Sequence, residues 1–202
     1  LDALSWSRHV VPYLDIPIQH SHPGVLRAMR RADTLATLPD LAPRLRARWP
    51  GVALRTTCLV GFPGETEAHF EHLVGYVEAA RFDHLGVFTY SPEEGTAAAA
   101  LPNPVPAAVA AARRDRLLAV QQRIAAAANR ARIGTAARVL LQGPAPTGRN
   151  RWIARAPWQA PDVDGVTRVS GLPAAARAGD FATVRITATR GFDLGAVVRG
   201  EW

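Results

Sequence analysis

The chain has 202 residues, a formal net charge of +7 and a hydrophobic share of 48%, so it can form one large core or a medium core beside a small one. It has no apolar run long enough to span a membrane and no signal-peptide pattern at its N-terminus, which predicts a cytoplasmic location. The single cysteine, Cys58, excludes an internal disulfide and any metal site built from several thiolates of this chain.

The positive charge favours acidic partners, either nucleic acid or an acidic protein surface. Every basic residue is an arginine, and arginine and alanine are abundant along the whole chain. Biased composition is therefore the simpler explanation, and the net charge alone does not identify a partner.

Strand and helix patterns alternate in the first part of the chain. We predict strands at 13–18, 52–60 and 82–90, and helices that start at 23 and span 38–49, 66–80 and 107–132. The helix at 66–80 has the clearest pattern, an apolar stripe behind a glutamate-rich start. The order strand, helix, strand is typical of βαβ units, so the sequence predicts a parallel sheet.

The pattern changes after Gly134 to short alternating stretches separated by turn dipeptides. We predict strands at 138–141, 152–154, 166–169, 181–187 and 194–198. Five short strands in such a segment are typical of a small β-barrel of the OB kind. The sequence therefore predicts two domains, an α/β domain at residues 1–131 and an all-β domain at residues 132–202.

The stretch LRTTCLVGFPGET, residues 54–66, takes an apolar strand into a glycine-rich turn and directly into a helix start. Ligands in α/β folds bind at the C-terminal ends of strands, so we expect a binding loop here. Gly61 and Gly64 permit a close backbone approach, and Pro63 fixes the turn. The backbone N–H groups before the helix can bind an anion, although a plain tight turn is the alternative.

Polar residues follow the first predicted strand at Gln19, His20 and His22. Two histidines at this spacing can face one metal ion, but no third ligand is near in sequence. A polar loop that contacts substrate is therefore the favoured interpretation, with His20 as a hydrogen-bonding or proton-handling group.

Arg55 and Thr57 lie on the same face of the next strand, because alternate residues point to the same side. A buried arginine needs an anionic partner, and Asp15 or a cofactor carboxylate would serve equally well. Cys58 points to the other side and is expected to be a packed, inert thiol. Tyr90 begins a loop with two glutamates that either contacts a ligand or is simply solvated.

Four motifs occur in an order that resembles one family. The motifs YLDIPIQH, PGVLRAMRR, LRTTCLVGFPGET and RFDHLGVFTYSPEEGTAA resemble the C-terminal half of the radical-SAM core of methylthiotransferases. The later stretches RRDRLLAVQQRIA, APDVDGV, AGDFATVRI and FDLGAVV are similar to that family's helical connector and TRAM domain. The resemblance implies an α/β fold: the C-terminal part of a radical-SAM, partial TIM-like β/α barrel, followed by a small all-β OB-like TRAM barrel.

The resemblance implies a transferase that uses S-adenosylmethionine and 4Fe-4S clusters. The family has two branches: one methylthiolates an aspartate of a small-subunit ribosomal protein, and the other modifies tRNA. This chain is similar to the ribosomal-protein branch in three motifs, QHSH after the first strand, FTYSPEEGTAA and APDVDG. In the family, a CxxxCxxC triplet and the cysteines of an N-terminal domain hold the clusters, because thiolates suit iron. With one cysteine, this chain is expected to bind no metal and to be inactive alone.

The resemblance places S-adenosylmethionine or substrate near residues at the strand ends, and none of them receives a catalytic role. They are Gln19, His20, Arg55, Thr57, Gly61, Pro63, Gly64, Glu65 and Tyr90. Candidate substrate-binding residues in the barrel are the arginines and one aromatic that suit RNA, namely Arg138, Arg151, Trp152 and Arg168. The alternatives are the tRNA branch, and a non-catalytic remnant that binds RNA or protein.

Overall fold

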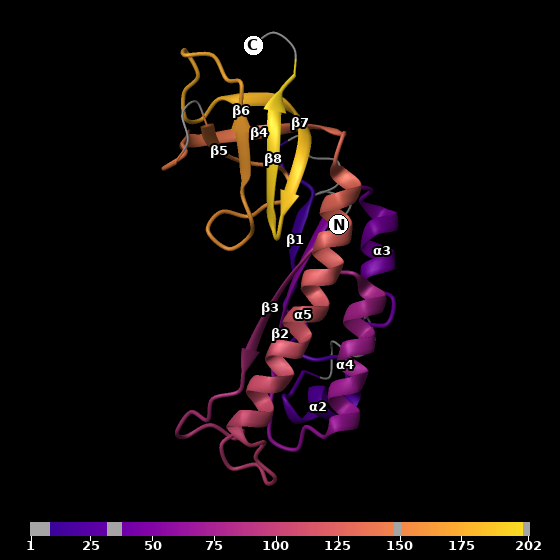
Figure 1. The fold of residues 1–202 in the computed structure, drawn as a ribbon. Coiled ribbons are helices and arrows are strands. Elements are labelled where there is room, and N and C mark those ends of the chain that lie inside the picture. Colours follow the sequence, from indigo (N-terminus) through magenta and orange to yellow (C-terminus); the bar gives the residue numbers. More distant parts are fainter. Residues whose placement is uncertain (1–8, 32–37, 148–150, 200–202) are drawn as a thin grey trace. The chain divides into compact units, whose positions relative to one another are not determined.

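The computed structural model describes residues 9–31, 38–147 and 151–199, and these form two compact units. One unit comprises Leu14–Ile124, and the other comprises the described residues of 9–13 and 125–199. Figure 1 shows an open sheet flanked by helices in the first unit and a small barrel in the second. No helix of the described residues is long and apolar enough to cross a membrane.

The first unit is built on a three-stranded sheet in the order β1-β2-β3. Its strands are β1 (Tyr13–Asp15), β2 (Ala53–Val60) and β3 (His84–Thr89). Strands β2 and β3 are parallel, which confirms the parallel sheet expected from the sequence. Its helices are α2 (Pro23–Ala28), α3 (Leu41–Arg48), α4 (Glu67–Ala80) and the larger part of α5 (Ala107–Arg132), whose residues 125–132 belong to the second unit. Helix α5 has the predicted bounds.

Strand β1 is shorter than predicted because Pro17 has no N–H group to continue the ladder. The chain nevertheless stays beside β2. The N–H of Ile16 donates to the Arg55 carbonyl at 3.0 Å, and Gln19 forms an isolated parallel bridge with Cys58. The polar residues that follow β1 are thus held at the C-terminal end of β2.

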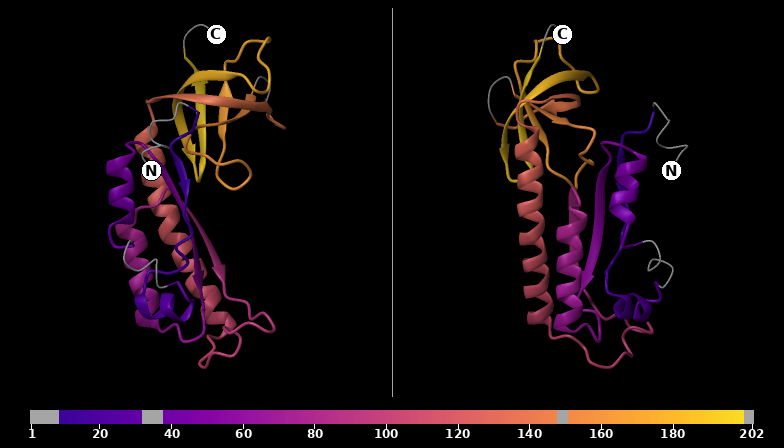
Figure 2. Two further views of the ribbon diagram at one scale, coloured as in Figure 1. Left: turned by 180° about the vertical axis from the view of Figure 1, so that it is seen from behind. Right: turned by 90° about the vertical axis from the view of Figure 1, so that its right-hand side faces the viewer.

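The alternation of β2 decides which of its side chains meet the helices. Its buried face carries Leu54, Thr56, Cys58 and Val60. The apolar residues of this face belong to the same core cluster as the apolar stripe of α4, which consists of Phe70, Leu73, Val74 and Val77. The opposite face carries the half-buried side chains Arg55, Thr57 and Leu59. Both views in Figure 2 show α4 and α5 running along the sheet. The candidate residues of β2 therefore point away from the helices.

Helix α4 begins at Glu67 because Thr66 caps it. The Thr66 hydroxyl accepts from the His69 N–H at 3.3 Å, and His69 Nδ1 accepts from the Thr66 N–H at 3.2 Å. This reciprocal pair satisfies two amides that the first turn of a helix otherwise leaves without a partner. The end of the preceding loop is thus fixed to the start of the helix.

The second unit is a closed barrel with the strand order β4-β5-β6-β8-β7, which confirms the predicted OB-like fold. Its strands are β4 (Ala136–Pro144), β5 (Arg151–Arg155), β6 (Thr167–Ser170), β7 (Phe181–Arg190) and β8 (Asp193–Val198). Strands β6 and β8 are parallel, and the other neighbours are antiparallel. Alternate residues such as Val139, Val184 and Ile186 are fully buried in its core.

Candidate functional site

The β2–α4 loop, residues 61–66, needs glycine at two positions. Gly61 and Gly64 have φ angles of +79° and +81°, a region that other residues rarely adopt. A Cβ added to Gly61 would lie 2.5 Å from the Cβ of Ala110 in α5. The loop can therefore lie against α5 only because this position has no side chain.

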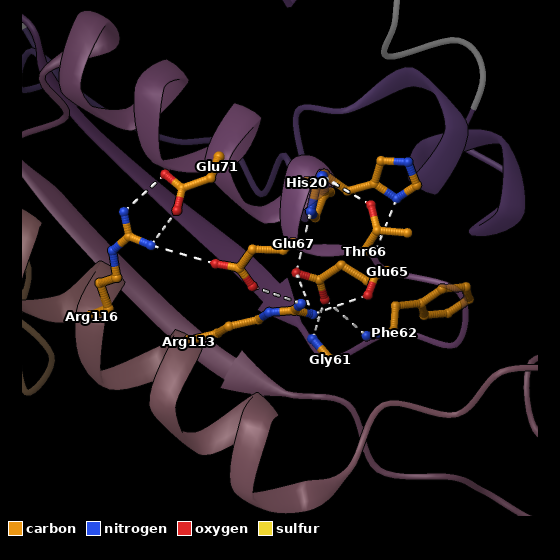
Figure 3. A network of polar contacts seen from close by, with 10 residues as sticks. His20, Gly61, Phe62, Glu65, Thr66, Glu67, Glu71, Arg113 and Arg116 are labelled. Carbon is orange, nitrogen blue, oxygen red and sulfur yellow. Dashed lines mark hydrogen bonds and ion pairs between the residues drawn. The ribbon is translucent and has the colours of Figure 1, made fainter.

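The amides of this loop are bound within the chain. The N–H groups of Gly61 and Phe62 both donate to Glu65 Oε2, the second at 3.2 Å (Figure 3). The Gly64 N–H donates to the Asn103 carbonyl at 2.8 Å, and the Glu65 N–H donates to the Phe62 carbonyl at 2.9 Å. These findings correct the interpretation of the loop as a site for an external anion, because the anion on its amides is the chain's own Glu65 carboxylate.

Glu65 is the centre of a buried polar network. Its second carboxylate oxygen, Oε1, lies 3.6 Å from Arg113 Nη1 and 3.8 Å from His20 Nε2. Arg113 also donates to the Glu65 carbonyl at 3.1 Å and to Glu67 Oε2 at 3.1 Å (Figure 3). The side chains of His20 and Glu65 are fully buried, and that of Arg113 is nearly so. The network joins three segments distant in sequence: the one after β1, the β2–α4 loop and α5.

The hydrogen bonds of His20 and His22 identify what their rings can do. His20 Nδ1 accepts from the His22 N–H at 2.9 Å, so the ring proton of His20 lies on Nε2 and faces Glu65. His22 Nδ1 accepts from the Gly24 N–H at 3.2 Å and caps α2, while its ring stacks on His69. Burial lowers the pKa of His22, and electrostatic repulsion from His69, His72 and Arg27 acts in the same direction. Nowhere in residues 9–31, 38–147 and 151–199 do three or more histidine, cysteine or acidic side chains converge as a metal would require.

Two cavities adjoin the loop at the strand ends. The first, about 350 Å³, is lined by Gln19, Leu59 and Phe62 together with Met29, Arg30 and Leu101. The second, about 320 Å³, includes Gly61, Pro63 and Tyr90 in its lining. The Tyr90 hydroxyl is buried without a hydrogen-bond partner among the described residues. Both volumes lie at the lower end of the range for small-molecule sites, and apolar walls with a few polar groups are typical of them.

The remaining candidates of the first unit lie further along the sheet. Arg55 Nε is 3.3 Å from Asp15 Oδ2, so the structural ion pair that the sequence allowed is present. Thr57 lies next to Gly86 of β3 on the same face. Cys58 is fully buried and burial raises the pKa of its thiol, so the prediction of a packed, inert thiol is confirmed.

The barrel carries a separate groove of about 710 Å³. Its lining includes three arginines, Arg151, Arg168 and Arg190. Arg168 forms an ion pair with Asp193, with 3.1 Å between Nη2 and Oδ2. Arg138 lies outside this groove, with its guanidinium 4.3 Å above the ring of Phe181. Trp152 packs against the barrel core rather than lining the groove. The structure thus brings together two of the four barrel candidates.

Arg113 and Phe62 are site residues that the sequence analysis did not select. Arg113 is one of several arginines in α5, and nothing in its local pattern marks it as the arginine that meets Glu65, 48 positions away. Phe62 lies inside the glycine loop, so its position in the wall of a cavity at the strand end could be predicted from the sequence.

The two units together define a class of protein: an α/β unit with a glycine loop and cavities at the ends of parallel strands, continued by an OB-like barrel. Residues 133–198 match the TRAM domain family. The chain is similar to proteins named ribosomal protein uS12 methylthiotransferase RimO. It is 48% identical over 197 residues to the one from Thermosynechococcus vestitus, 47% over 194 residues to the one from Synechocystis sp. and 50% over 194 residues to the one from Synechococcus sp. strain RCC307.

These alignments cover 97%, 96% and 95% of this chain but only 43%, 43% and 40% of the respective relatives. The chain thus corresponds in sequence to the C-terminal part of the RimO proteins. This confirms the resemblance carried by the sequence motifs.

Proposed function

We propose that this chain is the C-terminal part of a radical S-adenosylmethionine enzyme that methylthiolates an aspartate of ribosomal protein uS12. The observation that carries the proposal is an identity near 48% over 97% of the chain to a protein named for that activity. In this proposal residues 1–131 are the end of a radical-SAM β/α barrel with its helical connector, and residues 132–202 are the TRAM domain. We place the protein in the cytoplasm, where its ribosomal substrate is made.

The cavities at the strand ends suit S-adenosylmethionine. The single cysteine of the chain does not suit a 4Fe-4S cluster. Leu59 and Phe62 offer apolar walls that exclude water, and Gln19 and the orphaned Tyr90 hydroxyl offer polar groups. One S-adenosylmethionine bound there, given an electron by a 4Fe-4S cluster held outside this chain, would supply a carbon radical, and a second S-adenosylmethionine would supply the methyl group. A 4Fe-4S cluster does not fit this chain, because its one thiol is buried between the sheet and α4.

The chain alone is therefore expected to be inactive. After anaerobic reconstitution with iron and sulfide, we expect well under one 4Fe-4S cluster per chain. Replacing Cys58 with serine should leave any residual iron unchanged, because that iron would be bound nonspecifically. A stoichiometric cluster that disappears in the Cys58→Ser variant would contradict this account of the chain.

The activity is tested in a chimeric protein in which this chain replaces the matching part of the Thermosynechococcus vestitus relative. We expect methylthiolated uS12 and unmodified tRNA. Modification of tRNA instead would move the protein to the other branch of the family.

The groove of the barrel favours RNA as an additional partner. It is lined by Arg151 at the start of β5, by β6, and by the end of β7 and the start of β8, and it overlaps the surface with which OB folds bind nucleic acids. Its three arginines and single aspartate give it a positive charge that suits a phosphate backbone. We propose that a single RNA strand occupies this groove, and that ribosomal RNA is its source because the proposed substrate is a ribosomal protein.

We expect Arg151→Gln with Arg190→Gln to make the negative slope of log K against log salt shallower by about 1.4, since each contact to a single strand contributes about −0.7. Titration of a labelled single-stranded RNA at several salt concentrations measures this slope. Arg138→Gln is the matched control, because Arg138 lies outside the groove and its removal should leave the groove contacts intact. Equal slopes in the double variant and the unchanged chain would rule out the groove as the RNA site.

A further inference from the structure

The amides of Gly61 and Phe62 depend on a single acceptor. Both N–H groups donate to Glu65 Oε2, so the path of the backbone at the start of the β2–α4 loop depends on where that carboxylate lies. Phe62 belongs to the lining of one cavity and Gly61 to that of the other. Whatever fixes the Glu65 carboxylate therefore also fixes the edge that the two cavities share.

A buried carboxylate needs a positive partner, and Arg113 supplies it. His20 also approaches Glu65 Oε1, but its Nδ1 already accepts a hydrogen bond, so only its Nε2 can face the carboxylate, at 3.8 Å. The guanidinium of Arg113 always carries its charge and lies 3.6 Å from the same oxygen. It also donates to the Glu65 carbonyl, so one side chain contacts both the main chain and the carboxylate of Glu65.

Arg113 is itself held in place from α4. Its guanidinium lies 5.5 Å from the centre of the Phe70 ring and donates to Glu67, while the bulk of the side chain is buried. Arg116, nearly one turn further along α5, has similar surroundings: it lies 5.4 Å from the same ring and pairs with Glu71. Arg116 is half exposed and makes no contact with the loop in the described residues.

We propose that Arg113 is a positioning residue: it holds the Glu65 carboxylate against the Gly61 and Phe62 amides and so fixes the β2–α4 loop at the edge of both cavities. The positioning of the loop by Arg113 is argued from the contacts of Arg113 and Glu65 alone. The consequence for S-adenosylmethionine, which is weaker binding when the loop is released, rests on the proposed function.

The test is amide hydrogen exchange in the full chain, measured residue by residue by NMR. In Arg113→Met, the Gly61 and Phe62 amides should exchange about tenfold faster or more, because a charge-assisted hydrogen bond is weakened. The core amides of Leu73 and Val77 in α4 should keep their rates. Arg116→Met, the matched control, should change neither set, and Arg113→Lys should restore part of the protection because it keeps the charge.

A double-mutant cycle with Glu65→Gln completes the test. If Arg113 acts through the Glu65 carboxylate, the double variant should lose no more protection at Gly61 than Glu65→Gln alone. Unchanged exchange at Gly61 and Phe62 in Arg113→Met would overturn the proposal. So would equal acceleration at Leu73 and Val77, which would make Arg113 a general packing residue. If Arg113→Met does not fold, the exchange rates of the Gly61 and Phe62 amides in Arg113→Lys are compared with those in Arg116→Lys. Faster exchange in Arg113→Lys alone supports the proposal, and equal rates overturn it.

Titration with S-adenosylmethionine separates the two claims. Weaker binding by Arg113→Met than by the unchanged chain is the expected result. If the unchanged chain binds no S-adenosylmethionine, that result counts against the cofactor site of the proposed function, while the exchange rates still decide the role of Arg113.

Discussion

Replacing Gly61 with alanine should destabilise the first unit by about 3 kcal/mol, the sum of a strained positive φ and an overpacked contact. The new Cβ would lie 2.5 Å from the Ala110 Cβ, and Ala110 belongs to the helix that also carries Arg113. The substitution therefore pushes α5 away from the loop and separates Arg113 from Glu65. Urea unfolding followed by the circular dichroism of the helices measures the loss.

Gly75→Ala provides the matched control for this substitution. Gly75 is exposed in α4, and an added Cβ would meet nothing within 4 Å. Alanine there should raise the stability by about 0.5 to 1 kcal/mol, because glycine is a poor helix former. If both substitutions had the same small effect, the close approach of the loop to α5 would be contradicted.

Gly165→Ala should have an effect at least as large on the barrel, about 3 kcal/mol or more, because the overlap is with backbone and no side-chain rotation relieves it. A Cβ at this position would lie 2.1 Å from the Phe192 carbonyl oxygen. Gly165 precedes Val166, whose N–H donates to Asp193 at 3.0 Å and whose carbonyl accepts from Leu194. The substitution therefore separates the start of β6 from the β7–β8 turn.

Hydrogen exchange of the Val184 and Ile186 amides reports on the barrel independently of the first unit. We expect both to exchange faster in Gly165→Ala and at unchanged rates in Gly75→Ala. Unchanged protection in Gly165→Ala would show that the β7–β8 turn does not lie against Gly165 in solution.

The architecture was largely predictable because it follows from periodicity. The apolar stripe of α4 and the alternation of the barrel strands are local patterns, and the observed elements agree with them within a few residues. The exceptions have local causes as well. Pro17 ends β1 early, and α3 begins at Leu41, which leaves Pro43 in its first turn, where the missing N–H costs nothing.

The chemistry of the loop was less predictable because it depends on contacts distant in sequence. A glycine-rich turn before a helix predicts free amides, and only the structure shows that Glu65 folds back onto them. Arg55 illustrates the same limit: the sequence left a cofactor and Asp15 as equal partners, and the geometry shows the ion pair with Asp15. Composition gave no means of distinguishing Arg113 from its neighbours in α5.

The proposed role of the chain, as the C-terminal part of a uS12 methylthiotransferase, is tested most directly in the chimera with the Thermosynechococcus vestitus relative. After its clusters are reconstituted, the chimera is incubated with S-adenosylmethionine, a reductant and ribosomal small subunits, and uS12 is analysed by mass spectrometry. The unchanged relative is the positive control, and the chimera with Gly61→Ala is the loop control.

We predict methylthiolated aspartate in uS12 with the chimera, and a large loss of product with the Gly61→Ala chimera. A chimera that carries its clusters and cleaves S-adenosylmethionine, yet leaves uS12 unmodified under conditions in which the relative modifies it, would contradict the proposed function.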